Sequence, residues 1–475
     1  MNLSDFLTMR HEMLLTIVAL VVLITDINLS VKRKPMVINL AIGLFFIHTV
    51  IGFLPASTGI LFGGMYRSSA LTLMMKNILN VGVFIVLLQS ATWLKKAENL
   101  EKISEYFILL FSTLIGMNFM ISSGDFLMFY LGLELATIPM AALAAYVHHQ
   151  NRSAEAGVKL ILSSALSSGI LLFGLSMIYG TTGSVYFDQV AATYANTPLQ
   201  VLAFIFFFAG MSFKISLVPF HLWTADVYEG SPVNVTSYLS VISKGASVFI
   251  LTIILFTVFH SISFLWKDLV YAIAVSTMTI GNLFAIRQKN MKRFLAFSSI
   301  AQAGFILLGI IAGSQLGMTT VIYFVLIYIF SNLGAFGVVS AISAVTNKES
   351  MDDYDGLYHT NPKLSLVMML SLFSLAGIPP VAGFFGKFFL FTAAASAGYY
   401  WLVFIAVLNA TISLYYYLLV VKAMFINKSE MPIAYFKSDL YTRMGLFLCV
   451  AGIFALGFYS PLYEAILSIS NGLIH

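Results

Sequence analysis

Long apolar runs dominate the sequence and restrict it to one kind of fold. A run of roughly 20 mostly apolar residues is long enough to cross the hydrocarbon core of a bilayer. Fourteen such runs lie near residues 12–31, 36–54, 74–93, 105–122, 125–147, 156–180, 198–224, 233–259, 264–286, 293–313, 317–344, 363–398, 400–426 and 441–465. Only 9% of the 475 residues are charged, against about 25% in a typical soluble domain. The sequence therefore predicts an all-α polytopic membrane protein, with residues 1–475 forming one membrane domain.

Prolines interrupt two of these runs. Pro219 lies inside the seventh run, and Pro379 and Pro380 lie inside the twelfth, which is too long for one straight span. Proline removes a backbone donor and clashes with the preceding turn of a helix. We therefore expect helices 7 and 12 to be discontinuous.

The basic residues predict the orientation of the chain. Alternate loops carry seventeen of them: Lys32, Arg33, Lys34, Lys95, Lys96, Lys102, Arg152, Arg287, Lys289, Lys292, Arg293, Lys348, Lys363, Lys422, Lys428, Lys437 and Arg443. The opposite loops carry four: Arg10, Arg67, Lys76 and Lys267. Because Lys and Arg gather in cytoplasmic loops, both termini are expected outside.

Five charged residues within the runs form the group on which the functional interpretation depends. They are Glu134, Lys159, Lys214, Lys244 and Lys387. A charge at mid-membrane depth costs about 2.5–3.5 kcal/mol on insertion scales and usually marks an ion pathway. Lys159 is near a span end and has the alternative of extending to the surface. The alternative for the other lysines is capping of carbonyls at broken helices, and for Glu134 it is a structural pairing with a lysine.

A buried lysine beside a carboxylate suits proton transfer. Burial disfavours its charged form and an adjacent carboxylate favours it, so moving the carboxylate changes whether the lysine holds a proton. A pair of Glu134 and a lysine could therefore hold a proton, and further lysines could pass protons along through water. His221, at the end of the seventh run, is a possible relay residue or an ordinary helix-end residue.

The order of lysine and proline suggests an inverted repeat. Lys214 precedes Pro219 by five residues, whereas Lys387 follows Pro380 by seven, in spans of opposite direction. Inverted repeats of this kind are common in transporters. We expect one five-helix repeat over 105–259 and a second over 264–426, with spans 1–3 over 12–93 and span 14 over 441–465 outside them.

The sequence lacks motifs for redox or nucleotide chemistry. Cys449 is the one cysteine, so the chain has no CxxC metal site and no set of iron–sulfur ligands. No phosphate-binding glycine motif occurs either. We expect no cofactor and no metal in this chain, and no nucleic-acid partner, because its basic residues lie at span ends.

Three segments resemble one family. They read FKISLVPFHLWTADVYEGSPVNVTSYLSVISKGA, KRFLAFSSIAQAGFILLG and SLAGIPPVAGFFGKFFLF. They are similar to the antiporter-like subunits of respiratory complex I, the bacterial NADH:quinone oxidoreductase, and the fourteen-span layout extends the resemblance to the whole chain. The resemblance implies a hydrated proton path through Glu134, Lys159, Lys214, Lys244 and Lys387.

The resemblance also implies a setting. Partners would be the other membrane-arm subunits in the bacterial inner membrane, with NAD, FMN, iron–sulfur clusters and quinone held by the assembled complex. A lysine at 387 and the end of the chain soon after span 14 favour the subunit type without a long lateral helix. Two residues depart from the family: Ala225 replaces a frequent proline, and Gln302 replaces a frequent histidine, which removes a titrating group there.

Three other functions remain open from the residues. One is a subunit of a multi-subunit cation/proton antiporter, and another is a membrane subunit of a hydrogenase or ferredoxin-linked complex. The third is a structural scaffold, which loss of Lys214 and Lys244 without effect would favour.

Overall fold

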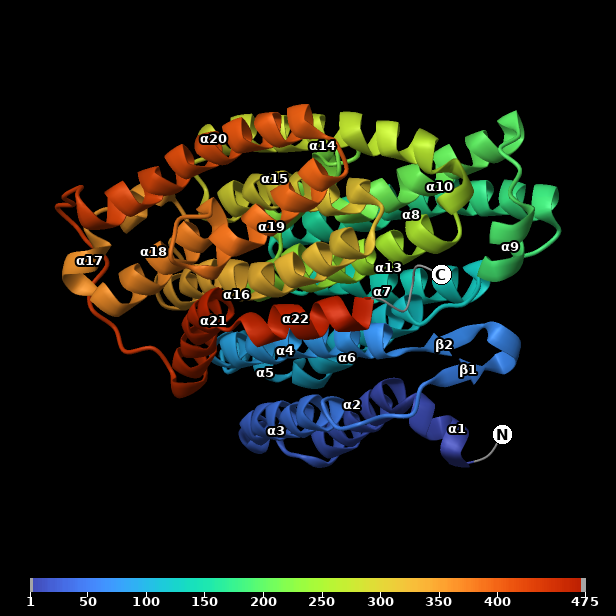
Figure 1. The fold of residues 1–475 in the computed structure, drawn as a ribbon. Helices are drawn as coiled ribbons and strands as arrows, with labels where there is room; N and C mark the ends of the chain where they lie inside the picture. Colours follow the sequence, from blue (N-terminus) through green and yellow to red (C-terminus); the bar gives the residue numbers. More distant parts are fainter. Residues whose placement is uncertain (1–2, 471–475) are drawn as a thin grey trace.

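The computed structural model describes residues 3–470, nearly all of them helical (Figure 1). In that range thirteen helices are long and apolar enough to cross a membrane, and two shorter apolar helices in series make a fourteenth span. The spans are α2 (Arg10–Asn28), α3 (Pro35–Gly52), α4 (Ala70–Leu94), α6 (Ile103–Ile121), α7 (Phe126–Ala144), α8 (Asn151–Thr182), α10 (Pro198–Ile215), α12 (Val233–Tyr238) continuing through the π-helical turn η3 (Leu239–Ser243) into α13 (Lys244–Thr257), α14 (Ser263–Ile286), α15 (Met291–Ala312), α16 (Gln315–Thr346), α18 (Pro362–Ala376) with α19 (Ala382–Ser396), α20 (Tyr400–Phe425) and α21 (Leu440–Phe458). The predicted all-α membrane fold is confirmed.

Short elements connect the spans at both ends of the bundle. The short helices are α1 (Leu3–Thr8), η1 (Val31–Arg33), η2 (Phe62–Gly64), α5 (Ala97–Leu100), α9 (Phe187–Thr193), α11 (Leu222–Gly230), η4 (His260–Ile262), η5 (Met351–Tyr354), α17 (Leu357–Thr360) and α22 (Ser460–Ser470). Strands β1 (Gly59–Leu61) and β2 (Tyr66–Ser68) form an antiparallel hairpin in which Ile60 pairs with Arg67. The hairpin and α1 lie at the same end of the molecule (Figure 1).

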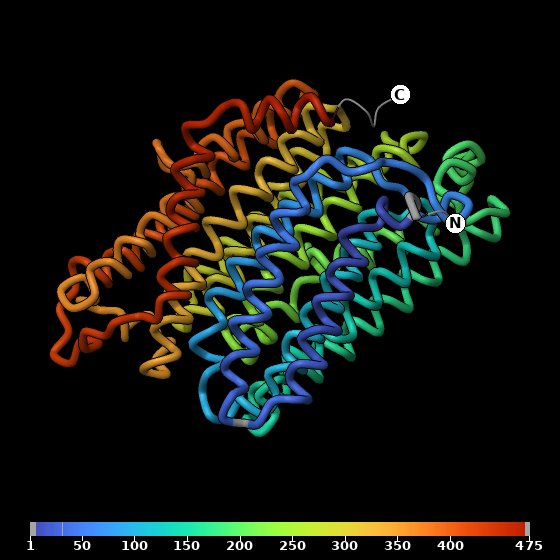
Figure 2. Tube along the Cα trace, turned by 90° about the horizontal axis from the view of Figure 1, so that it is seen from below, coloured from blue at the N-terminus to red at the C-terminus, as the bar shows by residue number. Residues whose placement is uncertain are grey.

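The bundle is arranged around three central helices. α2 and α3 form one edge and α14 with α20 the opposite edge, while α13, α15 and α16 lie between them (Figure 1). The most apolar stretches of Val233–Thr257 and α15 are completely buried, and that of α16 almost completely. Figure 2 shows the spans running alongside one another from end to end. Helices that are hydrophobic on every side are typical of the interior of a bundle. The three central helices are therefore surrounded by other helices rather than by lipid.

The seventh and twelfth spans are discontinuous, as predicted. Ser216 ends α10 in the left-handed conformation (φ 67°), and Pro219 lies in the non-helical segment before α11. Gly377 ends α18 with φ 89°, and Pro379 and Pro380 lie before α19. Both breaks expose backbone carbonyls at the end of a half-helix inside the bundle.

The predicted C-terminal end of span 14, at residue 465, is wrong. The run 441–465 is not one helix, because α21 ends at Phe458 and α22 begins at Ser460. Proline is tolerated in the first turn of a helix but not in its interior, so Pro461 divides the apolar run. α22 packs along α16 and α4 (Figure 1).

Three of the four basic residues assigned to outer loops, Arg10, Lys76 and Lys267, lie in helices. Arg10 is the first residue of α2, and Lys76 is inside α4 with 0% of its side chain exposed. Glu12 lies 2.6 Å from the Lys76 ammonium. The counter-charge explains how α4 holds a lysine where the loop assignment expects solvent.

Glycines bring α6 and α7 close together. A Cβ on Gly116 would lie 2.5 Å from the backbone nitrogen of Ala136, and one on Gly132 would lie 2.6 Å from that of Met120. Small residues at helix interfaces permit such an approach. The contact fixes α7, which carries Glu134 and Thr137 toward the centre.

Candidate functional site

Lys214 lies in the last turn of α10, next to α7. Its ammonium donates a hydrogen bond to Thr137 Oγ1. Glu134 is one turn earlier on α7 and half-buried, and its Oε1 is a buried atom without a hydrogen-bond partner among residues 3–470. In the described residues no ion pair within 4.0 Å joins Glu134 to a lysine. Lys214 is thus held by a hydroxyl, with the carboxylate one helical turn away.

Two small cavities adjoin Lys214. One, of about 10 Å³, is lined by Ser164, Ser167 and Ser168 of α8. The other, also about 10 Å³, is lined by Trp223 and by serines of α8 and η3. This is about the volume that holds one water molecule, and the hydroxyls supply the polar partners that a water requires.

The break after α10 is closed by side chains. The indole Nε1 of Trp223 donates to the carbonyl of Phe213 at 3.1 Å, and the two rings stack at 5.1 Å. Thr277 Oγ1 accepts the backbone N–H of Val218 at 3.0 Å. His221 precedes α11, and its buried Nδ1 has no hydrogen-bond partner in the part of the chain that the structure describes. The predicted relay residue His221 therefore lies in the break itself.

Lys244 is the first residue of α13, directly after the π-helical turn η3. Its ammonium donates to Ser299 Oγ at 2.6 Å, and it lies 5.6 Å from the centre of the Tyr228 ring. The side chain is almost entirely buried. A cavity of about 10 Å³, lined by Ser299 and Tyr328, adjoins it. Sequence analysis did not predict the π-helical turn, a feature frequent at functional sites.

Lys387 lies beside the second break. Its ammonium donates to the carbonyl of Ala376, the last residue of α18, at 3.0 Å. It also lies 4.5 Å from the centre of the Phe305 ring. This is the capping contact that the alternative interpretation of the lysines expects, and it places the charge at the negative end of a helix dipole.

Helix α15 connects the surroundings of Lys244 and Lys387. Next to Ser299, Ser298 shares a hydrogen bond of 2.5 Å with the hydroxyl of Tyr417. Gln302, one turn further along, donates to that hydroxyl at 3.2 Å and to the carbonyl of Leu375 at 2.9 Å. Leu375 precedes the residue that binds Lys387. The amide of Gln302 thus occupies the position between the two lysines.

Lys159 lies apart from the other lysines. It pairs with Glu155 at 2.7 Å and with Asp226 at 2.8 Å, and 42% of its side chain is exposed. Arg293 joins the group by binding Asp226 at 2.7 Å and Glu229 at 3.0 Å. This ion-pair cluster lies where the ends of α8, α11 and α15 meet, close to the surface. The position agrees with the alternative in which Lys159 extends to the surface.

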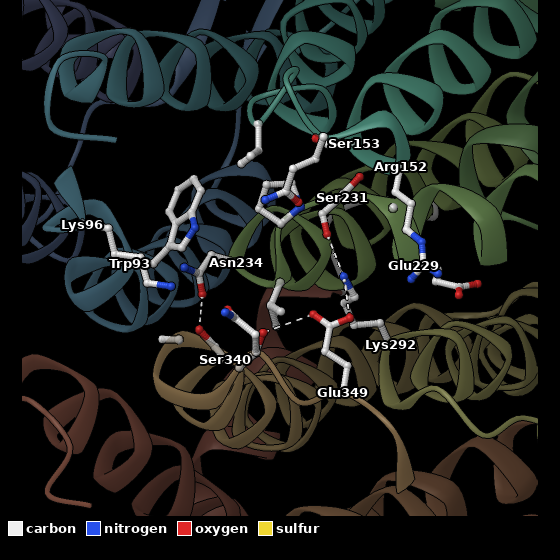
Figure 3. Close-up of a pocket in the computed structure, with 18 of the residues that line it drawn as sticks. Trp93, Lys96, Arg152, Ser153, Glu229, Ser231, Asn234, Lys292, Ser340 and Glu349 are labelled. Atoms are coloured by element: carbon white, nitrogen blue, oxygen red, sulfur yellow. Dashed lines mark hydrogen bonds and ion pairs between the residues drawn. The ribbon is translucent and has the colours of Figure 1, made fainter. Parts of the chain in front are cut away.

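A polar cavity of about 380 Å³ opens at the same end of the bundle (Figure 3). Its wall contains Lys292, which binds Glu349 at 3.1 Å and the carbonyl of Ser231 at 3.2 Å. At its inner side Ser340 donates to Asn234 Oδ1 at 2.6 Å. The cavity is large enough for many waters and leads toward η3.

Polar side chains continue from this cavity to Lys244. Ser237 donates to the carbonyl of Asn234 at 2.7 Å, and Ser240 donates to that of Ser237 at 2.9 Å. Asn332 then donates to both Ser240 Oγ and the Tyr328 hydroxyl, each at 2.9 Å. Tyr328 lines the cavity beside Lys244. The hydroxyl and amide groups form a series from the surface to the buried lysine.

Sequence analysis missed several of these residues. Ser299, Tyr328 and Asn332 are single polar residues in otherwise apolar helices, and Lys292 was assigned to a loop, although it is almost entirely buried. The detectable signal was weak: polar residues at helical spacing on α15 and α16. Among residues 3–470, no group of three or more His, Cys, Asp or Glu side chains is arranged to hold a metal ion.

Buried lysines beside two broken helices are typical of ion-translocating membrane proteins. Residues 123–413, more than half of the chain, match the family described as NADH:quinone oxidoreductase/Mrp antiporter, TM. The chain belongs to this family.

Individual relatives agree with this assignment. A protein of Phocaeicola vulgatus named NADH-quinone oxidoreductase subunit N is 52% identical over 465 residues, covering 98% of each chain. A chain of respiratory complex I from Thermus thermophilus, solved with bound aureothin, has a TM-score of 0.80 at 26% identity and covers 96% of this chain and 98% of its own. A chain of the Mrp complex from Dietzia sp. DQ12-45-1b has a TM-score of 0.85 at 20% identity, covers 100% of this chain and 98% of its own, and shows the fold alone.

Proposed function

We propose that this chain is a proton-translocating membrane-arm subunit of an NADH:quinone oxidoreductase. Electron transfer from NADH to quinone takes place in other subunits, which hold the NAD, FMN, iron–sulfur clusters and quinone. The relative that is 52% identical over 98% of this chain bears the name of such a subunit. The partners of this chain are then the other membrane-arm subunits, and the lipid bilayer.

One observation carries the proposal for the path. Polar groups follow one another from the 380 Å³ cavity to Lys244, and from Lys244 across α15 to Lys387. A proton needs such a series of hydroxyls, amides and waters because apolar side chains neither donate nor accept it. Protons would enter through the cavity, pass Ser240 and Asn332, and reach Lys244.

The transfer from Lys244 to Lys387 passes Gln302. A neutral amide does not titrate, but its N–H and carbonyl groups orient neighbouring hydroxyls and waters. Ser299 and Tyr417 supply hydroxyl groups on either side of it. In this proposal Gln302 positions the carriers and the two lysines hold the proton.

Glu134 and Lys214 form the controlling pair of the proposal. The structure holds Lys214 on Thr137, with Glu134 one turn away and one oxygen unpartnered. A side-chain rotation that brings carboxylate and ammonium together would stabilise the charged lysine. Lys159 belongs to the surface ion-pair cluster with Asp226. We propose that it stabilises the protein structure near the cavity and does not carry the proton.

We propose that the end of the bundle with the cavity lies on the cytoplasmic side of the bacterial inner membrane. The cavity wall includes Lys96, Arg152 and Lys292, which belong to the basic-rich set of loops. Because basic residues favour the cytoplasmic side, both termini are placed outside. We also propose that α6 to α13 and α14 to α20 are the two inverted five-helix repeats.

The alternatives predict different partners. A cation/proton antiporter has the same fold, and a chain of an Mrp complex superposes on this one. The identity to that chain is 20%, whereas it is 52% to the NADH-quinone oxidoreductase subunit. The antiporter and the hydrogenase or ferredoxin-linked alternatives are therefore not favoured.

The test is NADH-driven proton pumping by membrane vesicles that carry the assembled complex with Lys244→Ala or Lys387→Ala. Lys428→Ala, at an exposed loop position, is the matched control. NADH oxidation with an artificial electron acceptor verifies assembly. We expect a lower proton-to-electron ratio in the two variants of buried lysines and an unchanged ratio in the control. An unchanged ratio in both variants contradicts the path.

A further inference from the structure

A second group of buried ionisable side chains lies outside the path, between α2, α3 and α4. Glu12 and Lys76 form an ion pair at 2.6 Å, with 3% and 0% of their side chains exposed. Tyr66, from the hairpin, bonds to both: its hydroxyl donates to Glu12 Oε2 at 3.1 Å and accepts from Lys76 at 3.0 Å. These three groups satisfy one another.

Two histidines lie beside the ion pair and are linked by one amide. Asn80 Nδ2 lies 3.4 Å from Nδ1 of His11 and 3.3 Å from Nε2 of His48. The two rings are 5.8 Å apart at a nearly perpendicular angle. All three side chains are at least 98% buried. Within residues 3–470, no hydrogen bond or ion pair joins them to the path described above.

This bridge leaves three polar atoms without a partner in the described residues. They are Nε2 of His11, Nδ1 of His48 and Oδ1 of Asn80. Buried polar atoms are nearly always hydrogen-bonded, and a group that exists only to hold helices together would satisfy them. Three unpartnered atoms on one three-residue bridge point to a site whose donors and acceptors exchange.

The chemistry of the amide and the imidazoles allows two arrangements of this bridge. With Nδ2 toward both rings, Asn80 only donates, so the facing nitrogens of His11 and His48 accept and both rings are neutral. Rotation of the amide by 180° presents Oδ1 instead, which accepts from a ring that has gained a proton. The second arrangement uses the oxygen that is now unpartnered.

We propose that His11 and His48, bridged by Asn80, form a proton-binding site at the end of the bundle that carries α1 and the hairpin. His11 is the second residue of α2, and His48 lies one turn before the end of α3. Both therefore lie close to one membrane face, and the ligand is a proton exchanged with that aqueous phase. By the orientation proposed above, that face is the outside.

The surrounding charges limit the site to one proton. Arg10 binds the carbonyls of Gly52 and Pro55 at 2.6 and 2.9 Å, at the end of α3. With Lys76 it contributes two positive charges, and Glu12 contributes one negative charge. Tyr66 from β2 is neutral, and on the α6 side Phe45 stacks on Phe111 behind His48. This net positive surrounding disfavours even the first proton, and a protonated ring adds a further positive charge, so a second proton is opposed more strongly.

The histidine site is separate from the lysine path, since none of its hydrogen bonds within the described residues reaches a residue of that path. Its failure and that of the proposed function are distinguishable, because proton binding is measured here without any transport. The full chain, labelled with ¹⁵N-histidine and reconstituted in lipid vesicles, is examined by solid-state NMR between pH 5 and 9. The ¹⁵N shifts of imidazole distinguish the neutral tautomers from the protonated ring. His11→Gln and His48→Gln identify the two signals among the eight histidines.

We expect the two rings to titrate as a pair, with one proton shared between them. Loss of one ring should move the midpoint of the other by at least one pH unit, a tenfold change in proton affinity. Asn80→Asp should raise the midpoint by a similar amount, because a carboxylate accepts from both rings. Unchanged signals of the remaining histidines, such as His260, control for folding.

Two results would overturn the inference. The first is that both rings of the unmodified chain stay neutral throughout the titration, as in a purely structural bridge; this result needs no variant to fold. The second is that His11 and His48 titrate independently, with midpoints that neither the loss of the other ring nor Asn80→Asp changes.

Discussion

The ion pair of Glu12 and Lys76 permits a measurement of what an unpaired charge costs inside this bundle. We predict that Lys76→Met or Glu12→Gln alone lowers the free energy of unfolding by about 3–5 kcal/mol, because each leaves one buried charge without its partner. The double variant removes both charges and should lie within about 2 kcal/mol of the unmodified chain.

The magnitude follows from the geometry. At 2.6 Å between nitrogen and oxygen, with an effective dielectric constant of about 20, two unit charges attract by about 6 kcal/mol. Removal of both ions from water costs several kcal/mol each, so the pair as a whole contributes little. Loss of one partner removes the attraction but leaves the other desolvated. The coupling energy between the two substitutions should therefore be at least about 4 kcal/mol.

The single cysteine supplies the assay. Cys449 is fully buried in α21, so a thiol-reactive fluorophore labels it only when the bundle opens. Unfolding midpoints in mixed micelles of increasing denaturing-detergent content then give the four free energies of the cycle, with Lys428→Met as a surface control. If the loss in the double variant equals the sum of the single losses within about 0.5 kcal/mol, the two charges do not compensate each other and the reasoning is wrong.

Three further predictions concern the path and one surface pair. Lys214→Ala should abolish proton movement through this subunit while the chain still inserts; an unchanged proton-to-electron ratio in vesicles would contradict the relay. Asn332→Leu removes two donated hydrogen bonds, so it should lower the pumping rate but less than Lys244→Ala does, as measured by NADH-driven acidification. The Arg67 guanidinium, through its hydrogen bonds, lowers the pKa of Asp188. The pair is exposed, so it contributes at most about 1 kcal/mol to the free energy of unfolding. This contribution is complete above the ordinary aspartate pKa and is lost as the pH falls through the lowered pKa. Arg67→Gln should remove this acid dependence of the tryptophan-monitored unfolding midpoint, and an unaltered dependence would contradict it.

The layout of the fold was predictable because it depends on local properties. A run of about 20 apolar residues has to form a helix in a membrane, since its backbone groups find no other partners there. Pro219 and Pro380 break helices for reasons internal to their own residues. The end of span 14 was misjudged because hydrophobicity continues past Pro461 while the helix does not. The assignment of Lys76 to a loop was wrong because its counter-charge, Glu12, is 64 positions away in the chain.

The site was predictable only in its charged members. A lysine in an apolar run is conspicuous whatever surrounds it, so Lys244 and Lys387 could be found from sequence. Their partners could not, because Ser299 and the carbonyl of Ala376 acquire meaning only when distant helices pack together. The π-helical turn before Lys244 likewise depends on tertiary packing rather than on local propensity.

The three deeply placed lysines share one structural property: each lies where helix geometry changes. Lys214 is two residues before Ser216, the left-handed residue that ends α10. Lys387 binds the carbonyl of Ala376 at the end of α18, and Lys244 directly follows the π-helical turn η3. A helix C-terminus presents unbonded carbonyls and a partial negative charge, which favour a cation by about 0.3–2 kcal/mol. A regular helix offers no such acceptor, because its carbonyls are already bonded. At Lys387 the break and the lysine are therefore one feature, since the break provides the carbonyl that the ammonium binds, whereas Lys214 and Lys244 bind the hydroxyls of Thr137 and Ser299 on neighbouring helices.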